Sequence, residues 1–298
     1  MNLLDIANSV AGPPVGMALA RLLPARIAYR LADRGAEATA RRRGLPIVEA
    51  IRANQAVVRG LPLDDPSLEA ATEAVLVHAA RGYVDLFRAL AHGQQALIAG
   101  CTMMPDLQQA LVQGRSDGRG MLAVSGHLSC FDMLVLTLAA RGVAVQGLSY
   151  ADPRGSYRVQ NILRRRSGLI LTPISQAALR MAFARLRRGE LVLTGVDRPA
   201  PEGEMLRFFG RLARMPVGHA RLAIRTRARI LVGAMRSAGQ GHYEAVYLGM
   251  IDPLEMGREG GDPRAVAEAV LALLESPIRA RPEEWLMFFP VWPEVLQG

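Results

Sequence analysis

The sequence predicts an α/β fold, in which a central, mainly parallel sheet is flanked by helices and preceded by a helical N-terminal region. Up to about residue 115 the apolar residues recur at helical spacing. After residue 120, short runs rich in Val, Leu and Ile alternate with helical patterns. Strands that alternate with helices are typical of parallel sheets, because parallel neighbours need a crossover connection. We expect one domain over residues 1–298, with a helical part at 1–115 and an α/β core at 116–298.

The first predicted element is a helical stretch at residues 15–32 that carries several arginines, with a kink expected near Pro24. Charged residues and the pair Pro13 and Pro14 interrupt the apolar N-terminus, and no basic segment precedes it. We therefore expect neither a spanning helix nor a cleavable signal. The stretch could lie in a membrane interface or pack as an ordinary helix. A long helix follows the loop at 61–67, where seven residues recur at helical spacing: Leu68, Ala71, Val75, Ala79, Tyr83, Leu86 and Leu90.

Six apolar runs predict the strands of the core. They cover residues 121–125, 143–149, 169–174, 191–196, 229–235 and 243–249. Helical patterns at 131–142, 175–189 and 217–228 separate most of them, and a last helix is expected over 262–275. The alternation is the pattern of βαβ units.

The charge of the chain rests on one residue type. All 36 basic residues are arginine, against 27 acidic residues, for a formal charge of +9. The absence of lysine excludes a Schiff-base lysine and the phosphate-binding lysine of a P-loop. Guanidinium groups suit phosphate, carboxylate or oxyanion recognition but not proton transfer, although a GC-rich genome would also produce this bias. Cys101 and Cys130 lie far apart and indicate neither a disulfide framework nor a zinc site. We expect no bound metal and no cofactor.

One histidine stands where parallel sheets place their ligands. His127 follows the strand at 121–125 and Gly126, and Asp132 falls in the first turn of a helix expected to begin near Ser129. A carboxylate that accepts from Nδ1 would fix the tautomer and leave Nε2 free as a base. The alternative is that Ser129 and Asp132 form a helix-capping box.

Two arginine-rich segments are further candidates for binding. Seven arginines and no acidic residue lie between Met205 and Ile230, next to Phe208 and Phe209 in an expected loop. This segment suggests a phosphate-rich, partly apolar partner; alternatively it is a solvated helix face beside core aromatics. Residues 164–166 are three successive arginines, of which one could hold a developing oxyanion, unless the run is only a solvated helix end.

These motifs together resemble the lysophospholipid acyltransferase superfamily, and within it the late lipid A acyltransferase family. His127-x4-Asp132 matches the motif of the superfamily. Four further matches follow in order: an arginine before Gly168, Asp197, the segment at 208–223 that begins FFG, and the ending at 278–292 with its two tryptophans. Asp at the second motif position is more similar to the phosphatidylinositol mannoside acyltransferases, although that group tends to have glutamate at the segment of Asp197.

The resemblance implies the transfer of a fatty acyl group from acyl-CoA or acyl carrier protein to a hydroxyl of a membrane glycolipid, of phosphatidylinositol mannoside or lipid A type. It implies His127 as general base, Asp132 as its partner, Arg164 as oxyanion donor and Asp197 as a fourth catalytic residue, with no covalent intermediate. The family arginine is either Arg164 or Arg165. The residues expected to bind substrate are Arg165, Ser129, Phe208, Phe209, Arg211 and Arg214.

The same resemblance implies a protein held peripherally at the cytoplasmic face of the cell membrane, with an anionic membrane surface as partner. Two other classes stay open at this point. An inactive membrane-binding scaffold would use the arginines without turnover, and a nucleic-acid-binding protein would use them on phosphates. The low aromatic content of 5% and the lack of a nucleic-acid-binding motif disfavour the second.

Overall fold

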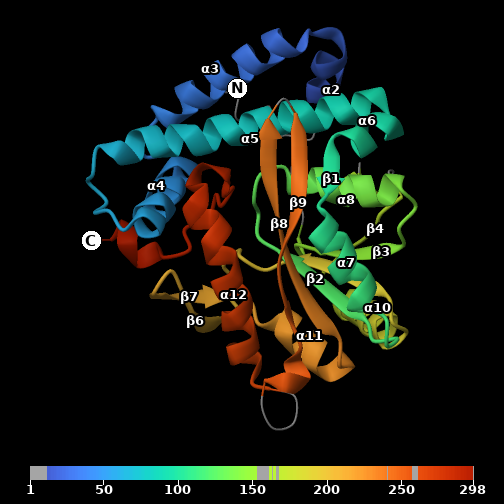
Figure 1. Cartoon of the computed structure of the whole chain (residues 1–298). Coiled ribbons are helices and arrows are strands. Elements are labelled where there is room, and N and C mark those ends of the chain that lie inside the picture. Colours follow the sequence, from blue (N-terminus) through green and yellow to red (C-terminus); the bar gives the residue numbers. More distant parts are fainter. Residues whose placement is uncertain are drawn as a thin grey trace.

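The computed structural model describes residues 12–152, 161–162, 164–165, 168–239, 241–256 and 261–297. Within this part of the chain a seven-stranded sheet has the order β1-β9-β8-β2-β5-β3-β4, so the predicted α/β class is confirmed (Figure 1). All neighbouring strands are parallel except β8 and β9, which are antiparallel. The strands are β1 (Cys101–Met103), β2 (Met121–Ser125), β3 (Val145–Ser149), β4 (Ile170–Pro173), β5 (Leu191–Gly195), β8 (Arg229–Gly239) and β9 (His242–Ile251).

The six apolar runs of the sequence correspond to six of these strands. The sequence did not predict β1, which comes from the helical part of the chain and pairs with β9. It also did not predict the hairpin of β6 (Glu204–Phe208) and β7 (Arg211–Met215), which forms a separate two-stranded sheet. The FFG segment, expected in a loop, lies at the turn of this hairpin, and Phe208 is the last residue of β6.

Helices cover both faces of the sheet. Alternate residues of β2 enter two different cores, because successive side chains of a strand point to opposite faces. Leu122 and Val124 pack in one core, which includes side chains of α10, α11 and α12. Met121 and Ala123 pack in the other, which includes side chains of α5 (Ser67–His92), α7 and α8. The helices of the core are α7 (Pro105–Gln113), α8 (Phe131–Ala140), α10 (Gln176–Arg187), α11 (Gly218–Thr226) and α12 (Pro263–Ala280).

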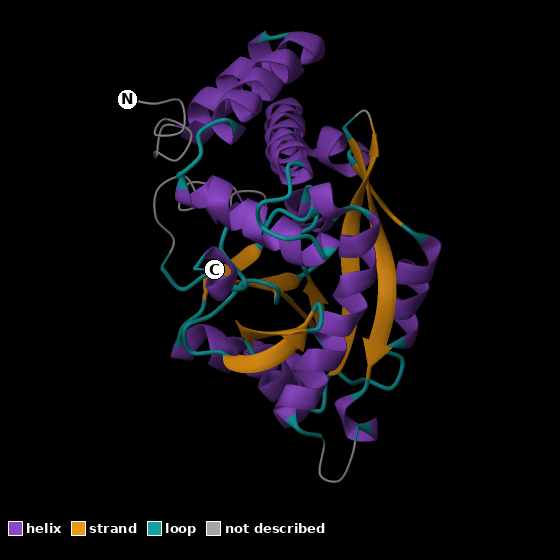
Figure 2. Cartoon of the chain, turned by 90° about the vertical axis from the view of Figure 1, so that its left-hand side faces the viewer, coloured by secondary structure: helices purple, strands orange, loops and turns teal. Residues whose placement is uncertain are grey.

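The N-terminal helices gather at one end of the molecule (Figures 1 and 2). They are α2 (Gly12–Leu22), α3 (Ala25–Ala40), α4 (Pro46–Arg59), α5 (Ser67–His92) and α6 (Gln94–Ala99). Pro24 separates α2 from α3, so the predicted kink is a complete break. Asp85 of α5 accepts hydrogen bonds from the hydroxyls of Tyr29 in α3 and Tyr243 in β9, which ties the N-terminal helices to the sheet.

Three short 3₁₀ helices complete the described elements: η1 (Pro253–Glu255), η3 (Pro282–Glu284) and η4 (Pro293–Leu296). The last two frame the C-terminal segment, which returns to the end of β2 and reaches the site described below. No helix among the described residues combines the length and the apolar character that crossing a bilayer requires.

Candidate active site

His127 lies at the carboxyl end of β2, in the middle of the sheet. The last residue of β2, Ser125, is level with Gly195 of β5 and Gly233 of β8. Two glycines allow a close approach at this edge. A Cβ on Gly195 would lie 3.0 Å from Cε1 of His127, and a Cβ on Gly126 would lie 3.0 Å from Oδ2 of Asp197. Side chains larger than hydrogen would therefore press on the histidine and on its carboxylate partner.

The partner of His127 is Asp197, which follows β5. Nδ1 of His127 lies 2.6 Å from Oδ1 of Asp197, and the backbone N–H of His127 donates to Oδ2 at 2.8 Å. Burial alone would raise the pKa of the Asp197 carboxyl. The facing His127 and the hydrogen bonds outweigh burial, so the pKa lies below its ordinary value. An ionised Asp197 makes Nδ1 the donor and leaves Nε2 as the acceptor, on a side chain that is 29% exposed.

Trp285 holds the other side of the same carboxylate. Its indole N–H donates to Oδ2 of Asp197 at 2.8 Å, and the ring is buried. Phe208 packs edge-on against Trp285 with ring centroids 5.9 Å apart, and Phe209 lies 6.2 Å from Trp285. Trp292 joins the cluster through Phe208, with centroids 5.7 Å apart. The FFG turn thus supports the tryptophan that orients Asp197.

The C-terminal segment also fixes the backbone of the site. The carbonyl oxygen of His127 accepts from the N–H of Leu286 at 2.8 Å, and Leu128 forms an isolated bridge with Trp285. The N–H of Ser129 donates to the carbonyl of Glu284 at 2.6 Å. Residues 127–129 are therefore anchored from two sides, by Asp197 and by residues 284–286.

Asp132 does not contact His127 in this way, so the predicted pairing of Asp132 with Nδ1 is wrong. Its two carboxylate oxygens accept from Nε and Nη2 of Arg164, at 2.6 and 2.7 Å. Arg164 is buried and also donates to Asn161 at 2.6 Å. The first turn of α8 turns the Asp132 side chain to this arginine. The fork of Arg164 is engaged with Asp132 and Asn161, which does not match the expectation of a donor aimed at an oxyanion beside His127.

Ser129 and Arg165, two further residues predicted to bind substrate, occupy different environments. Ser129 is buried, and its hydroxyl lies 3.0 Å from Nε2 of His78. Ser129, predicted to bind substrate, therefore packs inside the protein. It also does not cap the helix, because α8 begins after Cys130 without a side-chain cap. Arg165 is exposed, and Arg166 lies outside the described residues.

The β6–β7 hairpin divides the predicted substrate-binding residues. Phe208, predicted to bind substrate, is fully buried in the aromatic cluster and packs against Trp285 and Trp292. Phe209 is partly buried, its N–H donates to Glu275 at 2.5 Å, and Arg279 lies over its ring. Arg211 and Arg214 are exposed, and Arg214 donates to the carbonyl of Gly203. Alternation along the strands explains the difference between the buried and the exposed members.

Neither cysteine has the environment of a nucleophile. Cys130 is buried beside α5, and its thiol donates to the carbonyl oxygen of Gly82 at 3.6 Å. Burial raises the pKa of the Cys130 thiol well above its usual range and that of the Cys101 thiol to about 12. Among the residues that the structure describes, no group of three or more His, Cys, Asp or Glu could hold a metal ion.

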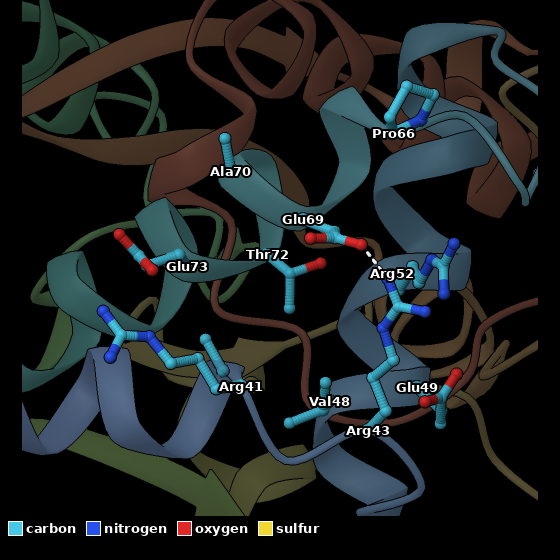
Figure 3. A pocket seen from close by; sticks show the side chains of 11 residues that line it. Arg41, Arg43, Val48, Glu49, Arg52, Pro66, Glu69, Ala70, Thr72 and Glu73 are labelled. Atoms are coloured by element: carbon cyan, nitrogen blue, oxygen red, sulfur yellow. Dashed lines mark ion pairs between the residues drawn. The ribbon is translucent and has the colours of Figure 1, made fainter.

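Two cavities are found among the described residues, one beside the site and one among the N-terminal helices. One of about 550 Å³ is bounded by Leu128 and Glu284 next to the site and extends along β8, β9 and α12. The other, of about 520 Å³, lies among α3, α4 and α5 and contains none of the predicted site residues (Figure 3). Its charged walls partly neutralise each other, for example in the ion pair of Arg43 and Glu69.

Trp285 and His78 are neighbours of the site that local sequence patterns do not reveal. Trp285 lies 88 residues beyond Asp197, and His78 lies 51 residues before Ser129. Tryptophan in the closing segment was part of the resemblance, but its hydrogen bond to Asp197 depends on the path of the C-terminal segment. Local spacing carries no information on that path.

A partly exposed imidazole backed by a buried carboxylate, at the carboxyl edge of an α/β sheet, is an arrangement found in enzymes that use histidine as a base. Comparison with known proteins specifies the family. The family described as bacterial lipid A biosynthesis acyltransferase matches residues 14–294, and the chain belongs to this family.

Curated relatives agree with this assignment. A phosphatidylinositol mannoside acyltransferase of Mycobacterium tuberculosis is 26% identical over 285 residues, which cover 93% of this chain and 86% of the relative. The protein of the same description from Mycolicibacterium smegmatis is 27% identical over 288 residues, covering 94% of this chain and 90% of the relative. The family match and these relatives show that the protein is an acyltransferase.

Proposed function

We propose that the protein transfers a fatty acyl group from a thioester, acyl-CoA or acyl carrier protein, to a hydroxyl of a membrane glycolipid. The observation that carries the proposal is the His127–Asp197 pair, in which Asp197 engages Nδ1 and the His127 side chain is 29% exposed. The family model and the mannoside acyltransferase relatives support a glycolipid acceptor.

The reaction needs one base and no protein nucleophile. Nε2 of His127 takes the proton of the acceptor hydroxyl as the oxygen attacks the thioester carbonyl. The negative charge of Asp197 stabilises the imidazolium and holds its tautomer. When the tetrahedral intermediate collapses, the carbon–sulfur bond breaks and the imidazolium returns the proton to the leaving thiol. General-base assistance of this kind contributes about 10² to 10⁴ in rate.

Because the Arg164 guanidinium is engaged with Asp132 and Asn161, other donors are needed to stabilise the oxyanion. The first turn of α8 has no side-chain cap, and its amide groups start four residues after His127. Helix N-termini present N–H donors and a positive partial charge to anions. We place the developing oxyanion at this turn, with Arg164 fixing α8 through Asp132.

His127→Ala tests the proposal most directly. We expect transfer from acyl-CoA to a phosphatidylinositol mannoside acceptor to fall by about 10³-fold or more, because the base is lost. His92→Ala is the matched control, since His92 is exposed at the end of α5, and it should leave the rate unchanged. Full transfer by the His127 variant would refute the mechanism, and absence of turnover in the wild-type protein would favour the inactive scaffold.

The membrane association rests on a separate surface, which we call the N-terminal face. Large apolar side chains of α2 and α3 are exposed there: Val15, Leu19, Leu22, Ile27 and Leu31, between 46% and 78%. Exposed arginines occur on the same two helices: Arg21, Arg26, Arg30 and Arg34. An apolar face bordered by arginines suits an anionic membrane surface, in which the apolar side chains enter and the guanidinium groups stay at the headgroups. We propose peripheral binding at the cytoplasmic face of the cell membrane through this face.

Aspartate substitutions test the N-terminal face. Leu22→Asp with Leu31→Asp should abolish co-sedimentation with anionic phospholipid vesicles, because each substitution puts a charge where an apolar group enters the membrane. Val112→Asp is the control, since Val112 is 74% exposed on α7, outside this face. Equal loss in both variants, or binding retained by the double variant, contradicts the assignment.

A further inference from the structure

The side chain after Asp197 has an unusual environment. The guanidinium carbon of Arg198 lies 4.1 Å from the ring centroid of Tyr150 and 3.9 Å from that of Phe289. Tyr150 follows β3, and Phe289 belongs to the C-terminal segment. Both rings are nearly half exposed, at 47% and 45%. We call these three residues the arginine clamp.

The rings of Tyr150 and Phe289 hold the guanidinium group, and no hydrogen bond from Arg198 to another described residue is present. The N–H donors of a guanidinium point outward in its plane, away from rings that pack against it. Arg198 has no carboxylate partner among the described residues. Arg164 and Arg281, which also lie near the site, both donate to acids. A stacked guanidinium without a carboxylate is preorganised for an anion that matches its fork.

The clamp also lies at the reaction edge of the sheet. β3 and β5 are parallel neighbours, with Leu148 level with Thr194. Tyr150 and Arg198 therefore leave the sheet at the carboxyl edge where His127 stands. Arg198 directly follows Asp197, the partner of His127, so an anion bound by the clamp lies on the same edge of the sheet as the base.

We propose that Arg198 binds a phosphate group of a substrate and so positions that substrate for the transfer, which rests on the proposed function. In a chain without lysine, only arginine can supply such a fixed cation. Both substrates can present this chemistry: the donor through the phosphates of CoA, and the acceptor through the phosphodiester of a glycolipid headgroup.

The experiment compares substrates with and without phosphate. The donor arm uses a long-chain acyl-CoA and the acyl N-acetylcysteamine thioester, which has no phosphate. The acceptor arm uses phosphatidylinositol mannoside and an alkyl mannoside. In Arg198→Ala we expect the KM of one phosphate-bearing substrate to rise by about 10- to 100-fold, as for a lost hydrogen bond to a charged group. The KM values of its phosphate-free analogue and kcat should stay within about twofold, and the arm that responds identifies the phosphate.

Two further variants keep the result interpretable. Arg198→Lys retains the charge without the fork and should give an intermediate KM. Arg187→Ala removes an exposed arginine at the end of α10 and should change no KM. Equal KM changes with and without phosphate, or a lowered melting temperature with unchanged KM, would show that the clamp only ties the C-terminal segment to the sheet and would overturn the proposal.

Binding without turnover separates this inference from the proposed function. Calorimetric titration measures the affinity for free CoA and for phosphatidylcholine vesicles with and without phosphatidylinositol. Wild-type protein should bind one of these ligands more tightly than Arg198→Ala even if no acyl transfer occurs. Equal affinities of both proteins for all of them would refute the role of Arg198, whatever the activity of His127.

Discussion

Two buried carboxylates near the end of β2, Asp197 and Asp132, have different partners and different roles. Asp197 faces an imidazole that is 29% exposed, whereas Asp132 faces a guanidinium that is 6% exposed. The ring of Phe131 contacts both pairs: its centroid is 5.0 Å from that of His127 and 5.9 Å from the Arg164 guanidinium carbon. A guanidinium stays charged at every relevant pH, so the second pair can only hold geometry, while the first can move a proton.

The largest expected effect tests which acid serves the base. Asp197→Asn should lower kcat by about 10⁴-fold, because an amide cannot hold the required tautomer or stabilise the imidazolium. The measurement is the initial rate of acyl transfer under saturating substrates.

Asp132→Asn is the matched control for that experiment. It keeps the shape of the other carboxylate but weakens its pairing with Arg164. It should therefore lower the free energy of unfolding by more than it raises the activation free energy of acyl transfer. A 10⁴-fold loss of kcat in Asp132→Asn, with Asp197→Asn nearly normal, would reverse the comparison and restore the pairing that the motif spacing suggested.

The next effect concerns the pair that holds geometry. Arg164→Ala leaves the buried Asp132 without its cation and should reduce the free energy of unfolding by about 3 to 5 kcal/mol. Urea denaturation followed by circular dichroism measures the change. A loss of less than about 0.5 kcal/mol would show that water can replace Arg164 as the partner of the Asp132 carboxylate.

A double substitution separates the charge from the packing. Asp132→Leu with Arg164→Met replaces both members by apolar groups, and it should recover most of the stability that Arg164→Ala loses. If this double variant is stable but transfers slowly, the pair serves to position α8 beside His127. If it transfers at the wild-type rate, the ionic character of the pair has no role in the reaction.

Local pattern was sufficient for the parts of the fold that depend on neighbours in sequence. The alternation of apolar runs and helices identified six strands, and the turn after 121–125 placed His127 at the correct edge. The pairing of the carboxylates was not accessible in the same way. Asp132 is five residues from His127, but the side chain that reaches Nδ1 lies 70 residues away, brought there by the parallel register of β2 and β5.

The FFG segment shows the same limit at the level of burial. Two adjacent aromatics beside arginines suggested a contact surface, but in a hairpin Phe208 turns inward to Trp285 while Phe209 begins the turn with a φ of 52°. β6 and β7 have only five residues each, so their alternation of buried and exposed side chains is hard to recognise in a segment with seven arginines. The role of the segment as a support for Asp197 depends on the C-terminal chain, which supplies Trp285.

The smallest expected effect tests the hydrogen bond from the Trp285 indole to Asp197, which has no counterpart at Asp132 among the described contacts. Trp285→Phe removes the indole donor and should lower kcat about tenfold, as expected for one hydrogen bond to a charged group. Trp292→Phe is the control, because Trp292 is equally buried and its indole N–H has no partner among the described residues. Both variants lose packing, so only the difference between them reports on Asp197.

Acid unfolding gives a second measure of the same hydrogen bond. The pKa of Asp197 is lowered in the folded state, so its contribution to stability is complete above the ordinary carboxyl pKa of about 3.9 and is lost as the pH falls through the folded value. Without the indole donor that folded pKa rises towards the ordinary value, so the contribution should be smaller, and its loss complete at a higher pH, in Trp285→Phe than in Trp292→Phe. Coincident acid transitions in the two variants would mean that the two contacts from His127 are sufficient to keep Asp197 ionised, and that Trp285 acts on the site only through packing.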